Sequence, residues 1–90
     1  MKYFYVYVLQ SQKDLNFYVG FTTILQKRIN THSKGEVNST KNRLPLILIY
    51  WEGCLSQEDP TQREKYLKTA WGKRYIKNRL KDFLIEAGNL

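Results

Sequence analysis

The sequence has few cysteines and no long apolar run, and each scarcity excludes a class of protein. Cys54 is the only cysteine, which rules out an internal disulfide and a cysteine-rich zinc site. This usage suits a reducing compartment, so we expect the cytoplasm. The first apolar run ends at Leu9, too short to span a bilayer, and no small-residue cleavage site follows it. We interpret that run as a strand and expect no membrane partner.

Common catalytic motifs are missing as well. The chain has one histidine, and it shows no His/Cys cluster at zinc spacing, no glycine-rich nucleotide loop and no serine in a nucleophile elbow. Metal-free nucleophilic catalysis therefore has no obvious participant. Acids are also few: 8 Asp and Glu stand against 15 Lys and Arg, a formal charge of +7. Such a charge favours a nucleic-acid partner, although a solvated basic surface explains the charge alone equally well.

What is present indicates one globular domain over residues 1–90. Hydrophobic residues make up 42% of the chain and aromatic residues 14%, enough large side chains for a small core. A chain of this length rarely divides into two domains. We find no internal repeat, linker or low-complexity segment.

Three short segments rich in aromatic and β-branched residues predict strands. Residues 3–9 and 16–21 flank a short polar loop and should form an antiparallel hairpin. Residues 46–51 follow Pro45 and are apolar on both faces, as expected of a central strand. The three segments together predict a three-stranded antiparallel sheet.

Helices are predicted after the hairpin and after the third strand. Thr23 and Gln26 form a capping box for a first helix that reaches about His32. Asp59 and Pro60 should cap and begin a second helix. Its apolar stripe and the stripe of a third, basic helix follow the same spacing: Tyr66, Leu67, Ala70 and Trp71, with a break or bend at Gly72, then Ile76, Leu80, Phe83 and Leu84. The predicted fold is an α+β domain in the order ββαβαα.

Five polar residues are candidates for chemistry, and each also has a structural explanation. Arg28 and His32 lie four residues apart on one helical face and could approach one phosphate, although an exposed polar face is the more frequent outcome. Glu64 lies on the flank of the apolar stripe, where a helix-favouring acid near the N-terminal end is equally ordinary. Tyr7 and Tyr18 lie in apolar strands, where tyrosines usually only pack.

The combination of these residues resembles the GIY-YIG nuclease family. The motif runs through Tyr5-Val6-Tyr7 and, eleven residues later, Tyr18-Val19-Gly20, with Thr22, Leu25, Arg28, His32 and a glutamate on a later helix. The resemblance spans about residues 3–80. Tyr5-Val6 and Val19 replace Gly-Ile and Ile at strand positions, where shape matters more than chemistry. Asn78 is a candidate for the family's late asparagine, and the alignment in its basic helix leaves that assignment open.

The resemblance implies an endonuclease that hydrolyses phosphodiester bonds with one Mg²⁺ or Mn²⁺ held by Glu64. One carboxylate suits magnesium, which keeps several water ligands. By similarity, Tyr7 accepts a proton from the attacking water, Tyr18 orients that water and His32 assists. Arg28 stabilises the charge on the pentacoordinate phosphate, which suits the fixed fork of a guanidinium.

Substrate binding is expected of basic residues that grip a polynucleotide without reading its sequence. Residues 33–43 are predicted to form an exposed connector, whose length suggests contact with a ligand. The candidate binding residues lie in this connector and in the last helix: Lys34, Lys41, Arg43, Lys73, Arg74, Lys77 and Arg79.

The chain looks similar to small stand-alone family members that resemble the nuclease domain of the bacterial excinuclease ABC. We therefore expect structure-directed cutting of DNA in repair or recombination. The alternatives are a non-catalytic nucleic-acid-binding module, an accessory protein that a partner brings to DNA, and an RNA substrate. A homodimer is a further possibility, because cutting both strands with one site per chain needs two copies.

Overall fold

The fold is an antiparallel sheet of three strands with helices on both faces. The computed structural model describes residues 1–88. The strands are β1 (Phe4–Ser11), β2 (Phe17–Thr22) and β3 (Leu46–Cys54), in the order β2-β1-β3. The predicted α+β class, the hairpin and the three-stranded sheet are confirmed.

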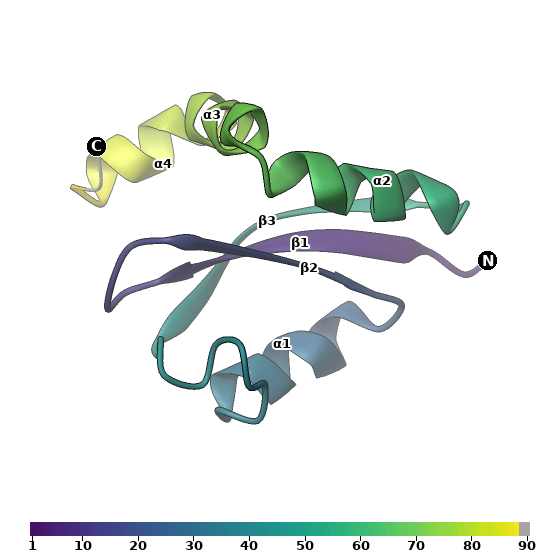
Figure 1. Ribbon diagram of the computed structural model, residues 1–90, viewed down its shortest axis with the longest axis horizontal. Coiled ribbons are helices and arrows are strands. Elements are labelled where there is room, and N and C mark those ends of the chain that lie inside the picture. The colour runs from purple at the N-terminus through teal and green to yellow at the C-terminus, as the bar shows by residue number, and fades with distance from the viewer. Residues whose placement is uncertain (89–90) are drawn as a thin grey trace.

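Figure 1 shows the helices in two groups on opposite faces of the sheet. One face carries α1 (Leu25–Ser33), and the other carries α2 (Glu58–Leu67), α3 (Ala70–Arg79) and α4 (Lys81–Glu86). The predicted order therefore holds as far as α3, and α4 is an additional element. None of the helices within residues 1–88 combines the length and apolar character that crossing a membrane requires.

The central strand is β1, not the predicted segment at residues 46–51. Val6 and Val8 on β1 are fully buried and pack with Leu67 of α2 and Ile76 of α3. By contrast, β3 is an edge strand, and its Trp51 side chain is 52% exposed. A continuous apolar run predicts burial on both faces only when another element covers each face, and part of β3 has no such cover.

The register of the hairpin decides which side chains share a face. Tyr7 pairs with Gly20, and Leu9 pairs with Tyr18. Because side chains opposite each other in an antiparallel pair project to the same side, Tyr7 and Tyr18 belong to the same face. That face is covered by α1, since His32 of α1 contacts the Tyr7 ring.

Two predicted helix starts are wrong. The capping box at Thr23 and Gln26 does not form, because α1 begins at Leu25 without a side-chain cap. Instead the Thr22 hydroxyl accepts a 3.1 Å hydrogen bond from the Ile24 N–H. Helix α2 begins at Glu58, so Asp59 is its second residue and not its N-cap. Pro60 is tolerated there, since N–H groups of a first helical turn lack partners within the helix.

The chain breaks between α2 and α3 just before Gly72, close to the predicted position. Thr69 is the N-cap of α3, and its hydroxyl accepts a 3.1 Å hydrogen bond from the Gly72 N–H. Gly72 is buried, and a Cβ there would collide with the backbone of Leu67. The predicted apolar stripe is consequently divided: Leu67 is buried, whereas Trp71 is 67% exposed. The predicted basic helix also ends early, and Leu80 separates α3 from α4.

Candidate active site

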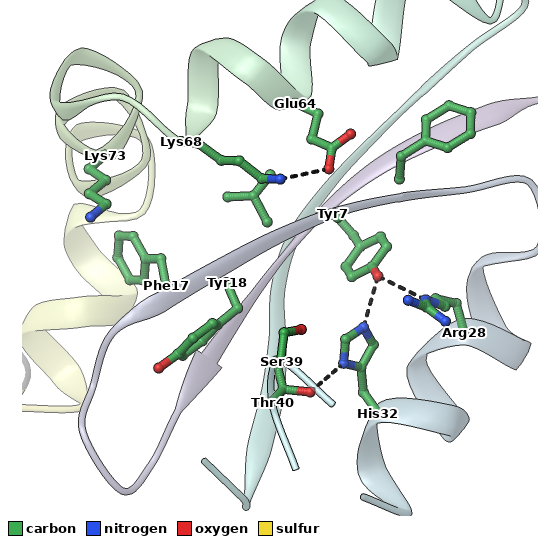
Figure 2. Close-up of a pocket in the computed structure, with 13 residues that line it drawn as sticks. Tyr7, Phe17, Tyr18, Arg28, His32, Ser39, Thr40, Glu64, Lys68 and Lys73 are labelled. Atoms are coloured by element: carbon green, nitrogen blue, oxygen red, sulfur yellow. Dashed lines mark hydrogen bonds and ion pairs between the residues drawn. The ribbon is translucent and has the colours of Figure 1, made fainter. Parts of the chain in front are cut away.

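A cleft of about 520 Å³ runs along the free edge of β2 and collects all five reactive residues predicted from the sequence. Figure 2 shows that they come from both sides of the sheet, with Arg28 and His32 on α1 and Glu64 on α2. The predicted residues in the lining are Tyr7, Tyr18, Arg28, His32 and Glu64. Further lining residues are Phe17, Val19, Gly20, Phe21, Ser39, Thr40, Lys68 and Lys73.

The Tyr7 hydroxyl is the meeting point of two residues of α1. It shares a 2.8 Å hydrogen bond with Nε2 of His32 and accepts a 3.2 Å hydrogen bond from Nε of Arg28. Tyr7 is 2% exposed and His32 is 4% exposed. The four-residue spacing of Arg28 and His32 thus places both on the face of α1 that meets the sheet, and not on an exposed polar face.

His32 has a second partner in the long connector. Its Nδ1 atom shares a 2.8 Å hydrogen bond with the Thr40 hydroxyl, and Thr40 is 1% exposed. The prediction of a wholly exposed connector over residues 33–43 is therefore wrong at Thr40. Two proton arrangements satisfy the ring: either Tyr7 donates and Thr40 accepts, or the reverse. Burial, followed by the charge of Arg28, lowers the pKa of His32 below its ordinary value of 6.5.

Gly20 makes room for the Tyr7 hydroxyl beside β2. A Cβ at this position would overlap the Tyr7 hydroxyl and its ring carbon. The residue opposite Tyr7 in the hairpin therefore has to be glycine for the ring to keep this position. The motif contained Gly20, but its contact with Tyr7 depends on the strand register.

Tyr18 lines the cleft, but its hydroxyl is held at the hairpin turn. It donates a 2.8 Å hydrogen bond to Oδ2 of Asp14, and Figure 2 shows the hydroxyl pointing away from Tyr7. Burial, followed by the hydrogen bond to Asp14, raises the pKa of Tyr18. Nε of Arg43 lies 3.3 Å from the same carboxylate oxygen. Arg43 thus links the connector to the hairpin, an interaction that the sequence pattern did not predict.

Glu64 brings the one carboxylate among the residues that line the cleft. Its side chain is 24% exposed, and Oε2 lies 3.0 Å from Nζ of Lys68, one turn further along α2. Exposed pairs of this spacing contribute only about 0.3–0.5 kcal/mol, so the carboxylate remains available to a competing cation.

The donor chemistry of the cleft fits Mg²⁺ or Mn²⁺ better than zinc. Within residues 1–88, no group of three or more His, Cys, Asp and Glu side chains converges as a ready metal cage. Zinc sites usually require three or four such protein ligands, whereas magnesium combines one or two carboxylates with water and phosphate oxygens. Glu64 is the residue that would hold the ion.

The predicted binding residues are dispersed over the molecule. Lys73 lines the cleft, whereas Arg74 stacks on Trp71 with its guanidinium carbon 4.8 Å from the ring centroid. Asn78 and Arg79 line a separate hollow beside α4, so the structure does not bring Asn78 to the cleft. The remaining predicted residues, Lys34, Lys41 and Lys77, are exposed. Sequence reasoning missed Lys68 and Thr40, which carry no motif signal of their own.

The comparison with protein families decides the family. The model of the GIY-YIG catalytic domain matches residues 3–82. The chain belongs to the GIY-YIG family. Its Tyr7, Tyr18, Arg28, His32 and Glu64 all lie within the matched range.

Relatives of similar size occur in several bacteria. The UPF0213 protein of Staphylococcus haemolyticus is 39% identical over 66 residues, which cover 72% of this chain and 79% of the relative. UPF0213 proteins of Streptococcus pneumoniae serotype 4 and Clostridium perfringens are each 38% identical over 65 residues. These alignments cover 71% of this chain and 65% and 69% of the two relatives. No solved structure matches significantly.

Proposed function

We propose that this GIY-YIG protein is a metal-dependent endonuclease that hydrolyses phosphodiester bonds in DNA. One observation carries the proposal: the buried chain Tyr7–His32–Thr40 opens on the same cleft as the Glu64 carboxylate, with Arg28 bound to the Tyr7 hydroxyl. Family membership supports the same reaction class. Branched or flapped DNA formed during repair or recombination is the proposed substrate.

Tyr7 and His32 suit a relay that removes a proton from the attacking water. The Tyr7 oxygen accepts the water's proton while its own proton passes to Nε2 of His32 along the 2.8 Å hydrogen bond. The lowered pKa keeps His32 neutral and therefore able to accept. Arg28 stabilises negative charge on the Tyr7 oxygen during the transfer.

Arg28 is also placed to bind the phosphate. A guanidinium carries five N–H donors, so Arg28 can hold Tyr7 through Nε and use other donors for phosphate oxygens. Because charge on those oxygens grows in the transition state, this contact accelerates the reaction and does not merely bind DNA.

Glu64 would hold a divalent ion at the opposite wall of the cleft. When bound, Mg²⁺ or Mn²⁺ supplies Lewis acidity toward the phosphate and the leaving oxygen. Tyr18 is proposed to line the substrate path, and its bond to Asp14 keeps the ring in place.

The test is cleavage of labelled duplex, nicked, flapped, branched and single-stranded DNA, with Mg²⁺, Mn²⁺ or EDTA present. We expect products that need the metal and that disappear with Glu64→Ala. Glu58→Ala is the matched control, since Glu58 lies on the same helix and does not line the cleft. Binding without products in every lane would instead identify a non-catalytic module, and an active Glu64→Ala protein would exclude the metal role.

A further inference from the structure

Lys68 occupies the position at which a metal ion is proposed to bind. Its Nζ lies 3.0 Å from Oε2 of Glu64, and both residues line the cleft. Figure 2 shows the ammonium reaching toward the carboxylate from the end of α2. The carboxylate meant for a cation is thus already paired with a cation of the chain itself.

The pair is built for exchange rather than for stability. The Lys68 side chain is 57% exposed, and both partners belong to the same helix turn, so the contact fastens no two elements together. The other flank of α2 shows the contrast. There Arg63 binds both carboxylate oxygens of Glu52 on β3, with each bond 3.1 Å long. That interaction ties α2 to the sheet, whereas the Lys68 pair leaves a flexible side chain free to turn.

The charges along the cleft give the released ammonium a new partner. The lining residues include three cations, Arg28, Lys68 and Lys73, but Glu64 is their single acid. Once a divalent ion takes Glu64, Lys68 has lost its counter-ion, and a substrate phosphate is the next anion within its reach.

We propose that Lys68 is a displaceable counter-ion of Glu64 that becomes a DNA phosphate ligand once a divalent ion binds. This inference rests on the proposed function. It makes Lys68 a competitor of the metal and a helper of the substrate. Removing the ammonium therefore has opposite effects on the two ligands, which a purely structural lysine would not produce.

The first measurement is Mn²⁺ binding without DNA, followed by electron paramagnetic resonance of the free ion. We expect Lys68→Ala to bind Mn²⁺ about two- to fivefold more tightly, as loss of a weak ion pair implies. Lys73→Ala controls for the general positive field, because Lys73 lines the cleft without pairing to Glu64. Lys65→Ala controls for loss of a charge from the same helix.

The second measurement is fluorescence anisotropy of a labelled DNA flap over a series of salt concentrations. We expect Lys68→Ala to bind less tightly and to lose about 0.9 from the slope of log K against log salt. Lys68→Arg should keep the wild-type slope. Melting followed by circular dichroism confirms that each variant is folded.

The outcomes separate this inference from the proposed function. If Glu64→Ala abolishes Mn²⁺ binding while Lys68→Ala binds Mn²⁺ or DNA as the wild type does, the role of Lys68 is rejected and the metal site stands. If Glu64→Ala still binds Mn²⁺ normally, the metal role of Glu64 fails, and the exchange at Lys68 fails with it.

Discussion

The Tyr7 hydroxyl lies in the space that a side chain on Gly20 would fill, directly across the β1–β2 pair. This relationship explains how a residue of the central strand reaches the cleft. Tyr7 is 2% exposed, yet its hydroxyl meets His32 and Arg28 at the cleft wall. Rigid packing holds the ring, and the missing Cβ opens the path to solvent and substrate.

Gly20→Ala should therefore disable the protein through Tyr7. The added methyl overlaps the hydroxyl and ring, and forced overpacking of this kind costs about 1–3 kcal/mol of unfolding free energy. We expect that loss in urea denaturation, together with loss of DNA cleavage.

A double-mutant cycle tests the stated cause. Tyr7→Ala removes the atoms that the new methyl would strike, so adding Gly20→Ala to it should cost much less than in the wild type. Additive free energies of the two substitutions would show that Gly20 acts through some other contact.

His32 should make stability depend on pH. Burial and the charge of Arg28 lower its folded pKa below 6.5, so below that pH the unfolded chain binds more protons than the folded one. The unfolding free energy then rises with pH up to about 6.5 and falls as the pH drops from 6.5 toward the folded pKa. Urea denaturation between pH 5 and 7.5 measures this slope.

The single histidine allows a direct reading of the same equilibrium. One imidazole signal is expected in a ¹H–¹³C NMR spectrum, and its titration midpoint should lie below 6.5. Thr40→Val removes the partner of Nδ1 while keeping the side-chain shape, and it should alter the tautomer seen by ¹⁵N shifts. A midpoint at or above 6.5 in the wild type would contradict the burial of a neutral His32.

Arg63 should matter far more for stability than the neighbouring Arg74. Its guanidinium binds Glu52 and lies 4.5 Å from the Tyr75 ring and 5.1 Å from the Tyr66 ring. Charge-assisted hydrogen bonds and stacking together predict a loss of about 2 kcal/mol for Arg63→Ala. Arg74→Ala removes one contact with an exposed ring and should cost about 0.5 kcal/mol. Equal losses in urea denaturation would argue against this tether.

Much of the fold could be predicted because it depends on local patterns. Alternation and apolar runs identified the three strands, and motif spacing identified Arg28, His32 and Glu64. Strand order could not be predicted in the same way, since β1 and β3 are both apolar and only the covering helices distinguish them. The break before α3 was predicted slightly too late in the chain, because the Thr69 cap competes with an apolar spacing that continues through it.

The parts of the site that escaped prediction depend on contacts between distant segments. Thr40 binds His32 only because the connector folds back under the sheet, although its composition is that of an exposed loop. Lys68 has the sequence character of any surface lysine, and only its shared flank with Glu64 gives it significance.

The basic residues of α3 should differ in their effect on DNA binding according to the flank they occupy. Lys73 lines the cleft, and Lys77 lies one turn later on the same flank, so both can follow a phosphate backbone beyond Glu64. We expect Lys73→Ala and Lys77→Ala each to lower the slope of log K against log salt by about 0.9 in flap binding. Lys65→Ala, off the cleft on α2, should change it less. Three equal changes would mean that DNA senses the overall charge of the protein rather than a path along the cleft.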